Sequence, residues 1–297
     1  MVQAHLYCPI VKTPDRSKTM AVAAADFIPE AMSRKSGIGI YPANEMTWTS
    51  VGKDGVDQKA VRADTENSHF LGLIRFMPEV GTGLHQHLGV ASSYFLAGSL
   101  MDFQGTAREG DMGINLPGAT HDAVTWDGCM LASRLEGPTI YPQADGKIHG
   151  LHTGAYEGEI VVRNPEILPD LNVRVEDVPP VATMLPGVTR RLLYDYRDVD
   201  DDHRLVSLNL MAGTHVPAHK TTALVDWYVA GGVVNFEDGR SAGAGSFVVL
   251  EPDSEIVVSS QYGAWLFAWA DGKPQWLDFD GPDLYGFTGT GAPAGSS

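Results

Sequence analysis

Hydrophobic and β-branched residues gather along this chain into short runs that turn residues separate. In the first half, such runs cover Phe70–Met77, Ser93–Phe103 and Met130–Leu135. In the second half, they cover Arg204–Met211, Asp226–Phe236, Ser246–Leu250, Ile256–Ser259 and Ala264–Ala270. Runs of this length and composition, bounded by Gly, Pro, Asn and Asp, are typical of β-strands. The one helical pattern, over Ala21–Arg34, is weak. The sequence therefore predicts an all-β sandwich or barrel.

The two halves of the chain repeat one another with a slowly growing offset. The offset is 132 between Gly55 and Gly187 (187 − 55) and again between His87 and His219 (219 − 87). It grows to 133 from Gly98 to Gly231, to 134 from Gly105 to Gly239, and to 135 from Gly128 to Gly263. Small loop insertions between two related domains produce such a drift. We therefore expect two tandem domains of the same fold.

Five segments follow from this repeat. Residues 1–47 form an N-terminal arm, 48–141 the first domain, 142–181 a proline-containing linker with edge strands, 182–285 the second domain, and 286–297 a tail. The tail consists mainly of Gly, Thr, Ala, Pro and Ser, so we expect it to be disordered.

Composition and charge exclude several classes of binding partner. The formal net charge of −16 in 297 residues repels nucleic acid backbones and anionic membranes. There is no apolar run of the 18 or more residues that a membrane helix needs, and no typical signal peptide. Two cysteines, Cys8 and Cys129, cannot build a disulfide framework. We expect a cytoplasmic protein that binds a small molecule, and neither nucleic acid nor membrane.

Three histidines have the spacing of a metal site. His85 and His87 are two positions apart, so both face the same side of a strand. His121 follows the Pro117-Gly118 turn, 34 residues after His87 (121 − 87). Imidazole suits zinc, iron, copper and nickel alike. The spacing predicts one divalent metal ion per chain, held by these three side chains.

These residues resemble the two sequence motifs of the cupin superfamily. The first motif comprises Gly81, His85, His87 and Gly98, and the second comprises Gly110, Pro117, Gly118 and His121. The resemblance covers about residues 48–140, and through the repeat about 182–275. It implies two tandem cupin barrels (the double-stranded β-helix or jelly roll) and, as is common among cupins, a homodimer. Trp48, Gly55, Arg75, Phe76 and Pro78 make the first domain most similar to cupin domains of the anti-sigma-factor type, a group that includes the acetylacetone-cleaving and dihydroxyacetophenone dioxygenase families.

The chain departs from the usual cupin pattern at one ligand. Most cupins place a metal-binding glutamate four or five positions after the second histidine, where this chain has Ala91 and Ser92. The C–C-cleaving dioxygenases of the superfamily also use three histidines and no carboxylate. The resemblance thus favours Fe(II), with zinc, nickel or manganese as alternatives. Further candidates for pocket lining are Tyr94, Gln104 and Trp126; core packing is the alternative for the two aromatic residues, and simple exposure for Gln104.

The second domain has lost two of the three ligands. The repeat aligns His85 with Pro217 and His121 with Ile256, and only His87 keeps a histidine counterpart, His219. We therefore expect a degenerate domain that serves packing, dimerisation or lid formation.

The resemblance implies a metal-dependent cupin enzyme, a non-haem iron dioxygenase that cleaves a C–C bond in a small ketone, diketone or hydroxy-aryl ketone. Two alternatives stay open at this point. One is a metal- or ligand-sensing module without catalysis, although no helical sigma-binding region is visible. The other is a non-oxidative cupin isomerase or lyase, which metal identity and oxygen dependence would distinguish.

Overall fold

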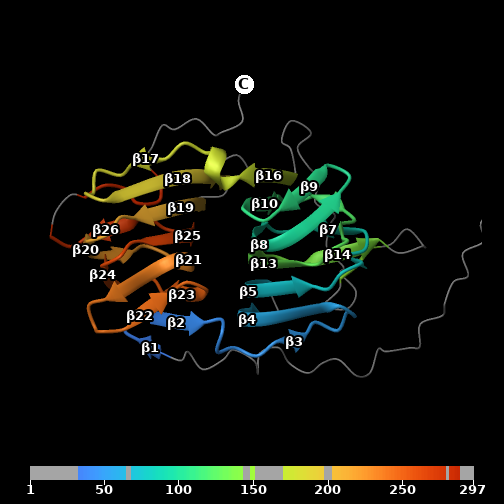
Figure 1. Ribbon diagram of the computed structural model, residues 1–297, viewed down its shortest axis with the longest axis horizontal. Helices are drawn as coiled ribbons and strands as arrows, with labels where there is room; N and C mark the ends of the chain where they lie inside the picture. Colours follow the sequence, from blue (N-terminus) through green and yellow to red (C-terminus); the bar gives the residue numbers. More distant parts are fainter. Residues whose placement is uncertain are drawn as a thin grey trace, which may run out of the picture.

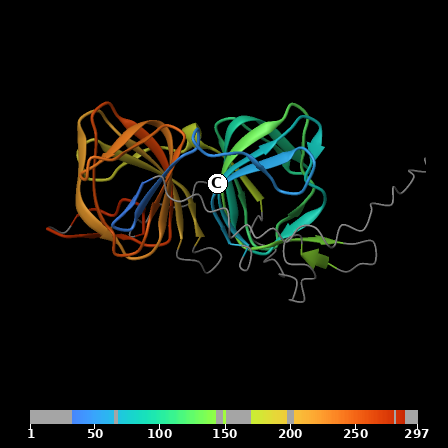
Figure 2. The same ribbon diagram turned by 90° about the horizontal axis from the view of Figure 1, so that it is seen from below.

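A computed structural model of the chain describes residues 33–64, 68–142, 148–150, 170–196, 203–278 and 281–287. Within these ranges the structure is all-β apart from the short 3-10 turn η2 (Val175–Asp177). The strands curl into two barrels that lie side by side, as Figures 1 and 2 show from two directions. The predicted all-β, two-barrel jelly-roll fold is confirmed. Among the described residues there is no helix of the length and hydrophobicity needed to cross a membrane.

The first barrel combines a large sheet with a smaller one that carries the histidines. The large sheet has the order β16-β10-β8-β13-β5-β4-β3, with β6, β9 and β12 at its margins, and the smaller sheet has the order β11-β7-β14-β15. The strands are β3 (Thr49–Ser50), β4 (Val56–Asp64), β5 (His69–Phe76), β6 (Val80–Gly81), β7 (His85–His87), β8 (Ala91–Asp102), β9 (Gly105–Arg108), β10 (Asp111–Asn115), β11 (Thr120–His121), β12 (Val124–Thr125), β13 (Cys129–Glu136), β14 (Thr139–Pro142), β15 (Ile148–Gly150) and β16 (Asp170–Arg174).

The edge strands of the second barrel, β1 and β2, come from the N-terminal segment of the chain. Its sheet has the order β1-β2-β23-β21-β25-β19-β18-β17, with β20, β22, β24 and β26 paired beside this path. The strands are β1 (Ser33–Lys35), β2 (Ile38–Pro42), β17 (Val181–Ala182), β18 (Val188–Asp195), β19 (Arg204–Leu210), β20 (Thr214–Thr221), β21 (Val225–Phe236), β22 (Ser241–Gly243), β23 (Ser246–Leu250), β24 (Glu255–Ser260), β25 (Ala264–Ala270) and β26 (Pro274–Trp276). In Figure 1, β2 lies at the foot of this barrel although it precedes the first barrel in sequence.

The repeat seen in the sequence recurs in the backbone, with one correction. Gly98 has φ +71° and faces the carbonyl of Gly128 so closely that a Cβ would overlap it. Gly232 has φ +72° and faces the carbonyl of Gly263 in the same way. Gly98 therefore corresponds to Gly232, one residue beyond the Gly231 that the sequence alignment selects. Both positions require glycine, because other residues disfavour this conformation and the space is filled.

An apolar layer and an ion-pair network join the two barrels. Tyr94 of β8 packs against Phe267 of β25, with ring centroids 4.2 Å apart. Beside this layer, Arg62 pairs with Asp226 at 2.5 Å and Arg134 pairs with Asp271 at 2.5 Å, each across the barrel boundary. Buried ion pairs are costly to break on one side only, since an uncompensated charge remains. The barrels therefore pack as one unit.

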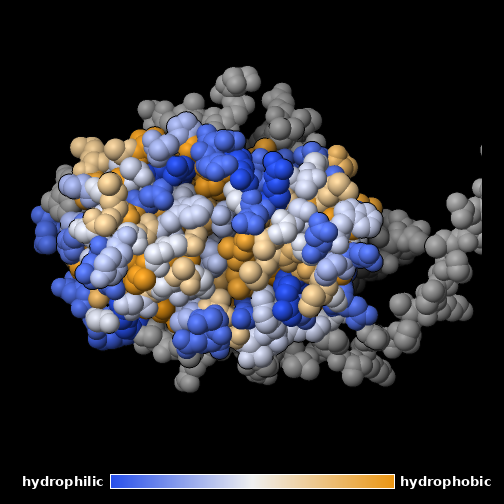
Figure 3. Space-filling model, viewed as in Figure 1, coloured by the Kyte–Doolittle hydropathy of each residue, from blue (hydrophilic) through white to orange (hydrophobic). Residues whose placement is uncertain are grey.

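Several sequence predictions fall at the margins of these barrels. The weak helix over 21–34 lies outside the described residues except for Ser33 and Arg34, which belong to β1. Most of the linker and the tail from residue 288 also lie outside them. The two large apolar clusters consist of buried residues, and on the face shown in Figure 3 hydrophilic and hydrophobic residues are interspersed.

Candidate metal centre

Strand β7 presents His85 and His87 to the interior of the first barrel. It pairs on one side with β11, where His85 lies opposite His121, and on the other with β14. Its middle residue, Gln86, points the other way and donates from Nε2 to the hydroxyl of Thr120 at 3.0 Å. The turn before β11 is tied to the same strand, because the Gly118 amide donates to the His87 carbonyl at 2.7 Å. Local pairing thus brings the two motifs together.

The three imidazoles converge through their Nε2 atoms. The Nε2–Nε2 distances are 3.2 Å from His85 to His87, 3.2 Å from His87 to His121 and 3.1 Å from His121 to His85. Nitrogen ligands sit about 2.0–2.1 Å from zinc-like ions, and at that radius this triangle corresponds to angles of about 100° at the ion. All three side chains are buried. The triangle fits one metal ion, and three nitrogen ligands leave further coordination positions of that ion unfilled by histidine.

Hydrogen bonds to the far side of two rings fix the tautomer that a metal needs. Nδ1 of His85 lies 2.7 Å from the Gly83 carbonyl oxygen, and Nδ1 of His121 lies 3.0 Å from Oδ2 of Asp102. Carbonyl and carboxylate oxygens accept, so each Nδ1 carries the proton and donates it. Nε2 of each ring is left with its lone pair directed at the centre. This donor set fits a cation, since converging lone pairs otherwise repel one another.

Burial also favours the neutral form of two ligand histidines, His85 and His87. It lowers the pKa of His85 to about 4, and the neighbouring His121 adds a smaller effect in the same direction. Burial also lowers the pKa of His87 well below its ordinary value, with the nearby His85 and His121 as further causes. Metal ions bind the neutral form of imidazole, so these two ligands need not release protons near neutral pH.

Asp102 is held rigidly behind His121. Its Oδ1 accepts the backbone N–H groups of Gln104 at 2.8 Å and Gly105 at 3.2 Å, at the turn between β8 and β9. Its Oδ2 is then free to face His121. This carboxylate is too far behind the ring to be a ligand. It orients the imidazole and adds negative charge one hydrogen bond away from the ion.

A second carboxylate, Asp170, comes from β16, an edge strand within the linker. Its Oδ1 lies 4.0 Å from Nδ1 of His121 and accepts Asn115 Nδ2 at 2.6 Å, while its Oδ2 accepts Gln104 Nε2 at 2.7 Å. Sequence analysis identified neither Asp102 nor Asp170. Asp102 sits in a turn like many others, and Asp170 is distant in sequence, so only the pairing of β16 with β10 places it.

A cavity of about 70 Å³ adjoins His121 within the first barrel. Its lining combines an apolar wall with a polar one. The apolar wall comprises Phe95, Leu100, Ala107, Ala123 and Leu131, and the polar wall comprises Ser93, Asp102, Asn115 and Asn172. Small-molecule sites combine surfaces in this way, since apolar surface gives affinity and a few polar groups fix orientation, but this cavity is smaller than the roughly 300–1,000 Å³ of a typical ligand pocket.

The three residues expected to line the pocket lie elsewhere. Tyr94 alternates with Ser93 and Phe95 on β8, so its ring faces the second barrel and contacts Trp265 and Phe267. Trp126 is 61% exposed. Gln104 is exposed as well, but its amide reaches Asp170 and so contributes to the network behind His121.

A second group of potential ligands lies between the barrels and is already neutralised. Glu136, His203 and Asp271 come within reach of one ion. However, Arg134 lies among them, with Nε 3.1 Å from Glu136 and Nη2 2.5 Å from Asp271. His203 donates from Nδ1 toward Glu136 at 3.1 Å. A guanidinium therefore occupies the place of a cation, and we interpret this group as an ion-pair network.

Comparisons with known proteins agree with this architecture. Residues 39–137 match the family model of the ChrR cupin-like domain. A Nostoc punctiforme protein provisionally named a dioxygenase is similar in structure with a TM-score of 0.63, at 9% identity, over 86% of this chain and 90% of that one. Oxalate decarboxylase from Bacillus subtilis gives 0.52, at 14% identity, over 82% and 78%. At these identities the likeness shows the fold alone. No curated protein sequence matches the chain significantly.

Proposed function

We propose that this chain, whose residues 39–137 match the model of the ChrR cupin-like domain, is a metal-dependent enzyme of the cupin superfamily. The proposed reaction is that of a non-haem iron dioxygenase, the cleavage of a C–C bond in a small ketone, diketone or hydroxy-aryl ketone. The observation that carries the proposal is the triangle of three converging imidazoles, with no carboxylate among the ligands, beside a cavity that opens on His121.

The histidines act as ligands and not as acids or bases. Their Nε2 lone pairs hold the ion, and the Nδ1 protons of His85 and His121 are engaged by Gly83 and Asp102. When bound, the ion supplies Lewis acidity toward the substrate oxygens and a route for reaction with oxygen. Asp102 keeps the His121 ring in position throughout. The apolar wall of the cavity lies on the His121 side of the centre.

The charge of the cavity favours a neutral substrate. Asp102 lines it, and among the described residues that line it none is Arg or Lys. The nearby Lys53 instead donates its amino group to the Thr82 carbonyl. A dianion such as oxalate would meet the half-buried carboxylate of Asp102, and the metal ion alone, with no guanidinium or ammonium group in the lining, would offset its charge. A neutral ketone or diketone fits this lining better.

The test compares the wild-type protein with His121→Ala and with His215→Ala, whose histidine is exposed on the second barrel. Mass spectrometry of metals should find about one iron per chain in wild type and His215→Ala, and a loss of bound iron in His121→Ala. Oxygen uptake should follow addition of pentane-2,4-dione or a hydroxyacetophenone, but not of oxalate, and only in the two metal-containing proteins.

Other outcomes would point to the alternatives. Stable zinc or nickel without oxygen uptake would favour a sensing module or a non-oxidative isomerase or lyase. Failure to retain any metal after reconstitution with Fe(II) would refute the metal centre itself. The homodimer and the cytoplasmic location expected from the sequence stay predictions.

A further inference from the structure

A row of small and polar residues crosses the inner face of the first barrel beside His121. Ser93 of β8 lies directly opposite Gly113 of β10 and Ser133 of β13. Gly113 in turn lies opposite Asn172 of β16. Residues that lie opposite one another on antiparallel strands face the same side of the sheet. No side chain of this row is large, and the cavity of about 70 Å³ lies against three of its members, Ser93, Gly113 and Asn172.

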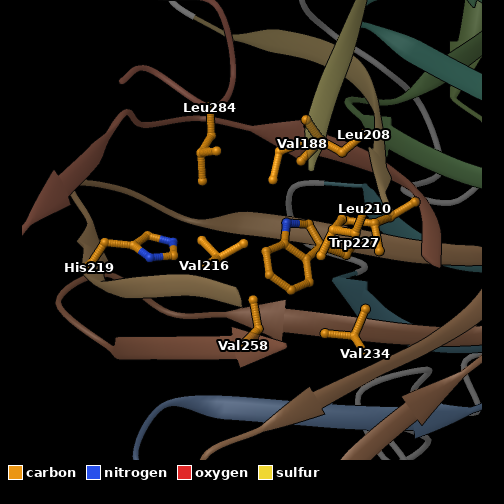
Figure 4. A pocket seen from close by; sticks show the side chains of 10 residues that line it. Val188, Leu208, Leu210, Val216, His219, Trp227, Val234, Val258 and Leu284 are labelled. Atoms are coloured by element: carbon orange, nitrogen blue, oxygen red, sulfur yellow. The ribbon is translucent and has the colours of Figure 1, made fainter. Parts of the chain in front are cut away.

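The second barrel carries large apolar residues at the same places. Ser93 stands five residues before Gly98, and Trp227 stands five residues before the corresponding Gly232. The residues that continue the row from Trp227 across the neighbouring strands are Val248, Ile40 and Ala268. Figure 4 shows the Trp227 indole inside this barrel, where the remaining cavity is only about 20 Å³. One fold is thus filled by a tryptophan in the second barrel and left open at a serine in the first.

The hydroxyl group of Ser93 has a proton that it can donate into the cavity. Its Oγ lies 2.7 Å from Oγ of Ser133. Ser133 is fully buried, at 0% exposure, and its hydroxyl group has no other hydrogen-bond partner among the described residues. Ser133 therefore donates to Ser93, since a buried donor without an acceptor is destabilising. Ser93 accepts this bond and keeps its own proton for a molecule in the cavity that it lines.

The surroundings of this donor suit a carbonyl group on a small hydrocarbon body. Phe95 and Leu131 pair with one another in the next inward-facing row and supply apolar contact. On the measure by which one water needs about 10–15 Å³, the cavity has room for about five water-sized groups. A ketone of four or five non-hydrogen atoms matches this space. A longer substrate would extend toward Asn172, the one exposed residue of the lining.

We propose that Ser93 determines the specificity of the first barrel by donating a hydrogen bond from its hydroxyl group to a carbonyl oxygen of a neutral ketone in the cavity. Ser133 is the positioning residue, because its own hydrogen bond leaves the Ser93 proton free. The inference rests on the proposed function for the class of ligand, a ketone. It goes further by naming the side chain that recognises the carbonyl group.

The experiment uses acetone with a ¹³C-labelled carbonyl group and the full-length protein with its metal, under argon so that no oxidation occurs. Infrared difference spectra report the hydrogen bond, because a carbonyl group that accepts one absorbs at lower frequency. NMR titration of the methyl groups of Ala123 and Leu131, which line the cavity, reports binding at this place. For four non-hydrogen atoms the Kd can be no tighter than on the order of 10⁻⁴ M, so the titration extends into the millimolar range.

Four variants isolate the hydroxyl group. In Ser93→Ala the carbonyl band of bound acetone should move to higher frequency, and the affinity should fall about two- to tenfold, as expected for one hydrogen bond. Ser93→Thr keeps the hydroxyl group and should keep the low-frequency band. The double variant Ser93→Ala/Ser133→Ala removes the buried donor that Ser93→Ala leaves without an acceptor, so it should share the band of Ser93→Ala in a more stable protein. Ser241→Ala, which removes an exposed hydroxyl group from the second barrel, should match wild type.

The inference is overturned if the band position and the affinity are the same in wild type and Ser93→Ala, or if acetone causes no saturable shift of the Leu131 methyl groups in wild type. Metal content and oxygen uptake of the same samples separate it from the proposed function. A band that depends on Ser93 in a protein without iron or oxygen uptake would support the ketone site and refute the dioxygenase. Iron and oxygen uptake with a band that ignores Ser93 would do the reverse.

Discussion

The carboxylate of Asp102 and the imidazole of His121 are joined by a hydrogen bond of 3.0 Å from Nδ1 to Oδ2. Nothing in the spacing of the histidines requires this pair, yet it completes the centre. The ligand glutamate that most cupins carry is absent here. Asp102 provides a negative charge in its place, but from behind the His121 ring. A bound ion would therefore have three neutral nitrogen ligands and a carboxylate one hydrogen bond away.

Replacing Asp102 with Asn should weaken metal binding. The variant loses the charge behind His121 and the acceptor that fixes its ring, and loss of such partners typically reduces affinity by about 10–100-fold. Competition with a chelator measures this directly. Asp127→Asn, which removes the same charge from an exposed position, should leave the affinity unchanged. Equal affinities for wild type and Asp102→Asn would show that the hydrogen bond is structural only.

Replacing Asp170 with Asn should also lower metal affinity, by a smaller factor, because Asp170 lies 4.0 Å from Nδ1 of His121. By thermodynamic reciprocity, metal binding should then stabilise the docking of β16 by the same factor. Hydrogen exchange of the amides of Leu171–Arg174 should slow when metal is added to wild type, and should respond less in Asp170→Asn. Asp177→Asn in the same segment, with an exposed side chain, serves as the control.

The ion-pair network between the barrels should be sensitive to loss of its central cation. Arg134 is buried and contacts Glu136 and Asp271. Arg134→Met leaves these carboxylates without their main partner, so the free energy of unfolding should fall by about 3–5 kcal/mol. Urea denaturation measures the change. Arg108→Met, at an exposed position of the first barrel, should stay within about 0.5 kcal/mol of wild type.

His219 should make the metal-free protein less stable in mild acid. Burial lowers its pKa below the ordinary value of 6.5, so the unfolded chain binds a proton that the folded chain resists. The associated stability is complete above pH 6.5 and is lost as the pH falls toward the folded pKa, at up to about 1.4 kcal/mol per pH unit. Urea midpoints at pH 7 and pH 5 should therefore differ less in His219→Leu than in wild type. Identical differences would contradict the assignment.

Gly98→Ala should destabilise the first barrel. Gly98 has φ +71°, and a Cβ there would overlap the Gly128 carbonyl. Strain of this kind costs about 1–3 kcal/mol, and the close contact adds to it. Thermal unfolding would report the loss. Gly243→Ala is the matched control, because no atom lies within 4 Å of its added Cβ.

The strands of both barrels could be predicted closely from the sequence. The run Asp226–Phe236 became β21, and Ala264–Ala270 became β25 without change. Each of these runs is β-rich and bounded by turns, and each appears in two copies, so the repeat supplied an independent check. The ligand histidines were predictable for the same reason, since alternation in a strand and a turn-linked partner are local properties.

The surroundings of the site were not predictable, because they depend on pairing between distant segments. Tyr94 is one residue from Ser93, which lines the cavity, and a shift of one residue reverses the face. Asp170 reaches His121 only because β16 returns to pair with β10. No local sequence pattern predicts that β16 pairs with β10. For the same reason the sequence does not reveal that Nε2 of His219 lacks a hydrogen-bond partner, because this depends on the residues that five other strands place around it.

The pairing of β2 with β23 sets the order in which this chain can fold. During synthesis, Ile38–Pro42 leaves the ribosome before either barrel exists, and its partner Ser246–Leu250 follows only after the whole first barrel has been made. The strand must wait while about 200 residues are added, and contacts of such sequence separation form slowly. Once β23 has been made, it has an open edge that another chain could pair with until β2 pairs with it. The second barrel is therefore not a module that can be excised at the linker: its cohesion depends on a strand encoded upstream of its neighbour.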